Sequence, residues 1–175
     1  MGRDCPGLEP EQRTVRLRLM DAVRTSRGTS VALFIAMLAT AIALGGALAH
    51  VFALPNKIDL NRDAYFTVQQ IYAGWSRFGY VLAVQFSAIV AVMVLSRNDR
   101  RVLWLAGVAL VGLLAAQTVF WMLTQPANAW TENWTRQPDN WEELRTQWEY
   151  SHAAGALCQL TAMIALIVAA LARQR

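Results

Sequence analysis

Charged residues are scarce in this sequence. They make up 16% of its 175 residues, whereas hydrophobic residues make up 55% and the mean hydropathy is +0.29. Soluble domains carry about 25% charged residues, so the deficit is typical of an integral membrane protein. Cysteine is scarce too: Cys5 lies in a polar segment and Cys158 in an apolar run. A disulfide between them is not expected, and the fold should not depend on an oxidising compartment.

Several catalytic signatures are also missing. The sequence has no glycine-rich phosphate loop, no nucleophile elbow, no Cys-x-x-Cys pair and no paired catalytic aspartates. Residues 1–29 are too polar to serve as the short leading region of a secretory signal, so no signal is expected. The basic residues flank apolar segments, where membrane orientation accounts for them, and we expect no nucleic-acid partner.

Four apolar segments dominate the chain. A bilayer-spanning helix needs roughly 20 mostly apolar residues, and unpaired backbone groups in lipid force such a segment to be helical. We therefore predict an all-α fold, a four-transmembrane-helix bundle over residues 30–175. Its spans are expected at about 30–55, 65–96, 101–124 and 141–172. Residues 1–29 form a basic amphipathic arm, predicted to lie on anionic lipid or to bind a partner.

The distribution of charge predicts the orientation of the bundle. Residues 1–29, the 96–101 turn and the C-terminal tail hold eleven of the sixteen basic residues, and the other connections hold seven of the twelve acids. The positive-inside rule then places both termini in the cytoplasm. We expect a multi-pass protein of a bacterial inner (plasma) membrane. Its tryptophan-rich surfaces would face lipid, a second copy or another membrane partner.

Polar side chains gather at one depth of the predicted bundle, in its outer half. Polar groups in lipid are costly and usually face the bundle interior or a watery cavity, so a shared level indicates one outward-opening pocket. The residues at this level are His50, Gln69, Gln70, Tyr72, Trp75, Gln117, Thr118, Trp121, Arg145, Trp148, Glu149 and His152. Trp104, Trp130 and Trp134 are instead predicted to be interfacial anchors.

Helical spacing arranges these residues in stripes. Trp141, Arg145, Trp148 and His152 fall on one face, and Glu149 can reach either Arg145 or His152. A second stripe contains Tyr65, Gln69, Tyr72 and Ser76. The Arg145–Glu149 spacing also fits a plain ion pair that lets the helix enter lipid.

One hypothesis is proton abstraction from a flat, apolar aromatic substrate. His50 or His152 would act as the base, because histidine titrates near neutral pH. Arg145 would stabilise the anion, with Glu149 beside it, and Tyr72 and Gln69 would donate hydrogen bonds. An electron-rich anion of this kind reacts with dioxygen without a cofactor. The residues predicted to bind the substrate are Trp75, Gln117, Trp121, Asn128 and Trp148.

Two further hypotheses involve a cofactor. Glu149-x-x-His152 has the helical spacing of carboxylate metal sites, and His50 would complete a single-metal site of two histidines and one carboxylate. Alternatively, His50 and His152 would be the axial ligands of one haem. A non-enzymatic reading, a membrane subunit or lipophile-binding protein, also stays open.

Some of these residues occur in a recognisable order. Ala49-His50 is followed by Leu54-Pro55 and Lys57, then by Gln69-Gln70-x-Tyr72, by Asn128, and by Trp141, Arg145, Trp148 and His152. With this pattern, residues 45–75 and 128–171 resemble a family of small four-helix integral membrane proteins, largely of unknown function, that includes the anthrone oxygenases. The resemblance implies a four-helix membrane fold and oxidation of anthrones to anthraquinones by dioxygen without an evident cofactor. It also implies that His50 and His152 are the candidate bases.

Overall fold

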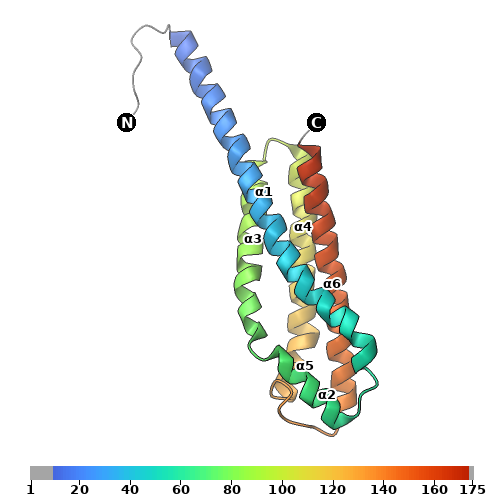
Figure 1. Cartoon of the computed structure of the whole chain (residues 1–175). Helices are drawn as coiled ribbons and strands as arrows, with labels where there is room; N and C mark the ends of the chain where they lie inside the picture. The colour runs from blue at the N-terminus through green and yellow to red at the C-terminus, as the bar shows by residue number, and fades with distance from the viewer. Residues whose placement is uncertain (1–9, 174–175) are drawn as a thin grey trace.

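The computed structural model describes residues 10–173, and these residues form a bundle of long helices closed at one end by short ones (Figure 1). The elements in chain order are α1 (Pro10–Lys57), α2 (Arg62–Gln69), η1 (Gln70–Tyr72), η2 (Trp75–Arg77), α3 (Phe78–Leu95), α4 (Arg100–Val119), η3 (Phe120–Thr124), α5 (Gln125–Trp130) and α6 (Trp141–Ala172).

Four helical segments of the described chain are long and apolar enough to cross a membrane. They are Val23–Lys57, Trp75–Leu95, Arg100–Trp130 and Trp141–Ala172. Helix α1 packs against α3 and α6, and α4 packs against α6. This confirms the predicted all-α, four-helix membrane bundle, and the predicted limits of the fourth span coincide with those of α6.

Helix α1 continues through the boundary predicted between arm and bundle. It is 48 residues long, which at the rise of an α-helix is about 70 Å, more than twice the thickness of a bilayer's hydrocarbon core. Its N-terminal part projects beyond the other helices (Figure 1). From residue 10 onward the predicted arm is thus an extension of the first span. The first nine residues of the arm lie outside the described residues.

The second predicted helix, 65–96, is interrupted, which corrects the sequence interpretation. Gly74 adopts a left-handed conformation with φ of 82°, which glycine tolerates because it has no Cβ. The chain turns at Gly74, and α2 lies across one end of the bundle, opposite the end at which α6 finishes at Ala172 (Figure 1). The Asn61 side chain caps α2 by accepting from the Ala64 N–H at 3.0 Å. Gln69 and Tyr72 therefore belong to this short cap and not to a spanning helix.

The third span contains a π-helical turn, η3, between α4 and α5. An extra residue in a turn rotates everything that follows around the helix axis. The Leu123 carbonyl accepts a hydrogen bond from the Gln147 Nε2 at 2.7 Å. Thr124 is buried and its hydroxyl lies 2.7 Å from that of Ser151. The π turn thus joins the third span to α6 through side chains.

Small residues allow α4 and α6 to approach closely. A Cβ added to Gly112 would lie 2.9 Å from the Cys158 carbonyl oxygen, a contact with backbone that cannot rotate away. Nearby, Gln85 of α3 donates to Gln159 of α6 at 2.8 Å and to Thr40 of α1 at 3.0 Å. Such interhelical hydrogen bonds between buried polar groups hold membrane helices in register.

We predict that Gly112→Ala destabilises the bundle by about 1–3 kcal/mol, because the added methyl group forces the two backbones apart. The matched control is Gly107→Ala on the same helix, where a Cβ meets nothing within 4 Å. The control should be neutral or slightly stabilising, since alanine favours helix. Unfolding by SDS titration in mixed micelles measures both. Equal stabilities of the two variants would contradict the close α4–α6 contact.

Candidate functional site

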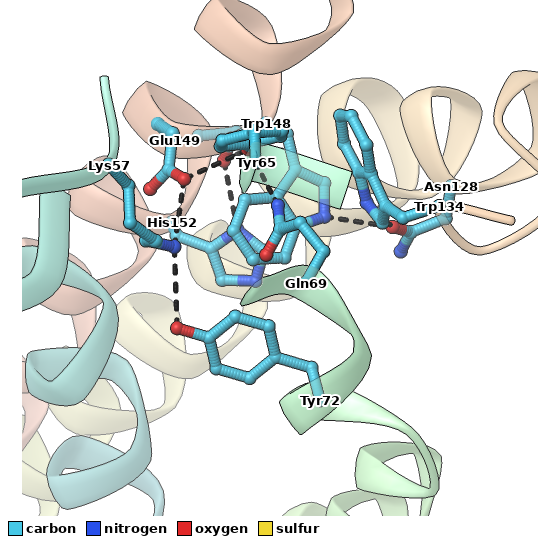
Figure 2. Close-up of polar contacts among 10 residues, drawn as sticks. Lys57, Tyr65, Gln69, Tyr72, Asn128, Trp134, Trp148, Glu149 and His152 are labelled. Atoms are coloured by element: carbon cyan, nitrogen blue, oxygen red, sulfur yellow. Dashed lines mark hydrogen bonds and ion pairs between the residues drawn. The ribbon is translucent and has the colours of Figure 1, made fainter. Parts of the chain in front are cut away.

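The candidate site is a cluster of rings and charged groups between the short helix α2 and the ends of the long helices α1 and α6. Helix α1 contributes His50 and Lys57 near its end, while α6 contributes Trp148, Glu149 and His152 near its start. Segment 65–72 covers them with Tyr65, Gln69 and Tyr72 (Figure 2). Most of the residues predicted to share one level are therefore brought together, although the covering segment is a cap and not a spanning helix.

The two histidines of the chain are in direct ring contact. Their ring centroids are 4.0 Å apart with planes tilted by 37°. His152 Nδ1 lies 2.9 Å from the Trp148 carbonyl oxygen. A carbonyl only accepts, so Nδ1 carries the hydrogen and, in the neutral ring, Nε2 carries the lone pair. His50 is buried, and its Nδ1 has no hydrogen-bond partner among the described residues.

Aromatic side chains surround the imidazole pair. The centroid of His50 lies 4.4 Å from that of Tyr72, 5.0 Å from that of Trp148 and 5.3 Å from that of Trp75. His152 lies 4.0 Å from Trp148 on the same measure. These rings contact one another, so the level predicted to hold an open pocket is filled by side chains in this structure.

A buried ion pair adjoins the rings. Lys57 Nζ lies 2.8 Å from Glu149 Oε1, with only 4% and 0% of the two side chains exposed. Lys57 also donates to the Tyr72 hydroxyl at 3.3 Å. Its ammonium lies 4.9 Å from the Tyr72 ring centroid and 4.8 Å from that of Trp148, which adds cation–π attraction. Lys57 is thus the cation closest to the imidazole pair.

Tyr65 and Gln69 hold the carboxylate from the other side. The Tyr65 hydroxyl donates to Glu149 Oε1 at 2.9 Å and accepts from Gln69 Nε2 at 2.6 Å. Burial, and then the nearby Glu149 charge, raise the pKa of Tyr65 and that of Tyr72. Both phenols therefore stay protonated at neutral pH. Gln69 was predicted to donate to a substrate, but its N–H donates to Tyr65, whereas its Oε1 has no partner within the described chain.

Arg145 takes a different place from the one predicted. Its Nη1 donates to the Leu60 carbonyl at 2.7 Å, and its guanidinium stacks 4.6 Å from the Trp141 ring centroid. Glu149 pairs with Lys57 and not with Arg145. Helical spacing permits the Arg145–Glu149 pair, but the buried end of α1 presents a closer cation. The Arg145 guanidinium lies 5.6 Å from the Tyr65 ring centroid.

Asn128 links two tryptophans to the cluster. Its Oδ1 accepts from Trp148 Nε1 at 2.8 Å and from Trp134 Nε1 at 3.2 Å. Trp134 is 4% exposed, so its prediction as an interfacial anchor was wrong. It follows two residues in left-handed backbone, Glu132 and Asn133, and adopts that conformation itself. The tight turn carries its indole inward. Trp104 and Trp130 are exposed, as anchors are.

Two predicted substrate-binding residues lie apart from the cluster. Trp121 is 64% exposed, because it stands on the outer face of the π turn. Gln117 is half-buried one turn before it and forms no hydrogen bond to the cluster in the described part of the chain. A regular helix would put Trp121 on the same face as Asn128, and the extra residue of η3 breaks that relation.

The residues predicted to hold a cofactor make other contacts in this structure. Within residues 10–173 no three His, Cys, Asp or Glu side chains are grouped to hold a metal ion. Oxygen Oε1 of Glu149 is taken by Lys57 and Tyr65. His50 and His152, the predicted haem ligands, are in direct ring contact with each other. A metal at His50, Glu149 and His152, or a haem, stays a prediction.

Sequence reasoning did not select Lys57 or Tyr65 as site residues. Lys57 entered the prediction only as part of the pattern that resembles the anthrone oxygenase family and as an outer charge, yet it is the sole lysine of a chain with fifteen arginines. A lone lysine directly after an apolar span is a signal that was available. Tyr65 stood in the Tyr65–Gln69–Tyr72 stripe, but its partner Glu149 lies on another helix, and no periodicity reveals that contact.

We predict that Lys57→Met destabilises the protein by about 3–5 kcal/mol, because it leaves the Glu149 carboxylate buried without a counter-charge. Adding Glu149→Gln should recover most of the loss. A matched control is Arg136→Met, since Arg136 and Glu132 form an exposed pair at 3.9 Å and surface pairs contribute little. SDS-titration unfolding of the wild type, the two single variants at Lys57 and Glu149, and the double variant gives the coupling. Additive losses in the double variant would contradict the buried pair.

Comparisons of the chain with protein-family models, curated proteins and solved structures gave no match. No relative therefore assigns a role to any residue, and the resemblance to the anthrone oxygenase family stays a prediction.

Proposed function

We propose that this membrane protein abstracts a proton from a flat phenolic, anthrone-like substrate and lets the resulting anion react with dioxygen, without a resident cofactor. One observation carries the proposal. An imidazole whose Nε2 is free to accept a proton lies in a buried aromatic cluster that also holds an ammonium. A base, a cation and apolar walls are the components that carbanion formation requires.

The surroundings of the cluster favour a substrate taken from lipid. The cluster lies at the end of the bundle remote from Arg97, Arg100, Arg101 and Arg173, where basic residues collect. By the positive-inside rule this distribution supports a cytoplasmic location for both termini, and we propose that the site lies in the outer half of a bacterial inner membrane. In this proposal the substrate reaches the site residues that face α2 by displacing Tyr72, which lies two residues before the Gly74 turn.

His152 is the better placed base. Its ring is fixed by the hydrogen bond from Nδ1 to the Trp148 carbonyl, which leaves Nε2 to receive a proton. His50 stacks on His152 and also contacts Tyr72. It therefore lies on the side of the cluster from which we propose that the substrate enters. The carbon acid of an anthrone is a CH₂ group between two aromatic rings, opposite a carbonyl, so its conjugate base is a delocalised oxyanion.

Lys57 replaces Arg145 as the nearest stabiliser of that oxyanion. Its ammonium donates to the Tyr72 hydroxyl, and the hydrogen of this hydroxyl has no acceptor among the described residues. A phenol that accepts from an ammonium is a stronger donor to a developing negative charge. The raised pKa of Tyr72 keeps that hydrogen in place at neutral pH. Glu149 and Tyr65 fix the position of Lys57.

The reaction balances without another reductant. The carbanion gives its electrons to dioxygen, and a carbon–oxygen bond forms to yield a hydroperoxide once a proton is added. Removal of the remaining hydrogen of that carbon then expels hydroxide from the peroxide, which leaves a ketone and, with a proton, water. In sum CH₂ and O₂ become C=O and H₂O, with all four electrons supplied by the substrate. The imidazole returns to its initial state.

A second candidate is a non-enzymatic subunit or lipophile-binding protein. The observation that favours it is the direct contact among the rings of His50, Tyr72, Trp148 and His152. Such packing would also be expected of a cluster whose role is to stabilise the fold. A metal- or haem-dependent redox protein is the third reading. Absorption spectra, metal analysis and turnover by the purified protein separate the three.

We predict oxygen-dependent conversion of an anthrone to an anthraquinone by the purified protein. His152→Gln should lower the rate at least about 100-fold, because general-base catalysis contributes 10²–10⁴-fold. Glu143→Gln, an exposed change on the same helix, is the matched control and should leave the rate unchanged. Oxygen consumption and product absorbance measure turnover, and circular dichroism checks that each variant is folded.

Three results would contradict the proposal. Full turnover by the His50→Ala/His152→Ala variant would remove both imidazoles from the mechanism. A haem absorption band, or a stoichiometric metal needed for turnover, would support the cofactor-dependent reading. A folded protein that binds the anthrone without converting it would support the lipophile-binding reading.

A further inference from the structure

We propose that the site selects a ligand with one negative charge, a phenolate or carboxylate on a flat aromatic body. This inference deepens the proposed function and rests on it for the aromatic shape of the ligand. The charge preference rests on a separate observation, an uncompensated cation beside the ion pair. This uncompensated cation is Arg145 and not Lys57.

The charges of the cluster do not cancel. Lys57 and Glu149 form one buried pair at 2.8 Å, and a proton that moves within the pair leaves their sum at zero. Arg145 remains, and in the described part of the chain its recorded hydrogen bond is to a neutral carbonyl, that of Leu60. Guanidinium does not deprotonate in proteins, so Arg145 keeps a positive charge that the buried pair does not balance.

Neighbouring groups do not supply the missing anion. Protonation of either imidazole would add positive charge, and the raised pKa values of Tyr65 and Tyr72 keep both phenols neutral. Glu142 and Glu143 lie close in sequence to Arg145, and Asp59 and Asp63 flank its partner Leu60, but all four acids are exposed to solvent, where water and salt screen them. Arg62, half-buried at 5.7 Å from the Trp141 ring centroid, adds a second positive charge on this side. Helix α6 begins at Trp141, so its positive dipole end also lies near Arg145.

Unsatisfied polar atoms mark the same place. Among the described residues five buried side-chain atoms lack a hydrogen-bond partner, and four of them belong to this cluster: His50 Nδ1, Gln69 Oε1, Arg145 Nε and Glu149 Oε2. Buried polar groups are ordinarily paired, so such a concentration indicates a position for a polar ligand group or ordered water. Arg145 Nε is a charged donor, and its natural partner is an anionic oxygen.

The walls fit an aromatic body. The Arg145 guanidinium stacks on Trp141 at 4.6 Å from the ring centroid and faces Tyr65 at 5.6 Å. Beyond Tyr65 come Glu149 and the imidazole cluster. A flat ring that enters at α2 by displacing Tyr72 would therefore meet aromatic faces, with a guanidinium on one side and an ammonium on the other. This arrangement favours an anion whose charge is spread over, or attached to, the ring system.

Three anthracene probes of equal shape test the charge preference. They are 9-anthracenecarboxylate, 9-anthracenemethanol and 9-(aminomethyl)anthracene, the last as its ammonium form. Binding to the full-length protein in nanodiscs of neutral lipid is followed by energy transfer from tryptophan, with empty nanodiscs as the background. We expect the carboxylate to bind at least tenfold more tightly than the alcohol, and the ammonium to bind most weakly.

Variants assign the preference to its source. Arg145→Gln should reduce the carboxylate-to-alcohol ratio to below about threefold, while affinity for the alcohol changes little. Glu142→Gln is the matched control, one exposed acid on the same helix, and should keep the wild-type ratio. Circular dichroism and unfolding confirm that Arg145→Gln is folded, and Arg145→Lys, which keeps the charge, should retain most of the ratio.

Equal affinities for the three probes, tighter binding of the ammonium, or no saturable binding at all would overturn the inference. So would a carboxylate preference that survives in folded Arg145→Gln. The proposed function fails separately: charge-selective binding without turnover of an anthrone refutes the oxygenase and leaves the anion site intact. Turnover of an anthrone without charge-selective binding refutes the anion site and leaves the oxygenase intact.

Discussion

The buried contact between Lys57 and Glu149 is the interaction on which the rest of the site depends. Two charges withdrawn from water are costly, and their attraction offsets this cost only when the geometry is good and further hydrogen bonds complete the pair. Here Tyr65 and Tyr72 provide those bonds. Because the pair joins α1 to α6, and its hydrogen-bond partners come from the segment between 65 and 72, it fixes three elements relative to one another at one end of the bundle.

Aromatic packing then builds outward from this pair. Trp148 touches both imidazoles and lies under the Lys57 ammonium, and Asn128 holds it by the indole N–H. The same amide oxygen orients Trp134, whose backbone carbonyl accepts from Gln70 of the cap. Side chains from the third span, the cap and α6 thus support one another. This preorganisation supports a site in which a base and a cation stand at fixed positions.

Much of the fold follows from hydrophobic runs. Lipid leaves a long apolar segment no alternative to a helix, and the predicted limits of the fourth span coincide with those of α6 for that reason. The structure differs from the predicted spans where the local backbone conformation departs from a regular α-helix. Gly74 turns the chain and separates α2 from α3, and the π turn η3 moves Trp121 outward while Thr124 and Asn128 face inward. Neither a single glycine nor one extra residue in a turn changes the hydropathy pattern enough to be noticed.

The sequence by itself determined the number of spans, the charge asymmetry between the two ends and the common depth of His50, Trp148 and His152, since each depends on composition and on residue order along a helix. Only the tertiary structure decided that Glu149 pairs with Lys57, that Arg145 lies over Trp141, and that the two imidazole rings contact each other. Periodicity assigns a side chain to a face of its own helix. Which residue it meets depends on how separate helices rotate and tilt against one another, and that is set by close packing across the whole bundle.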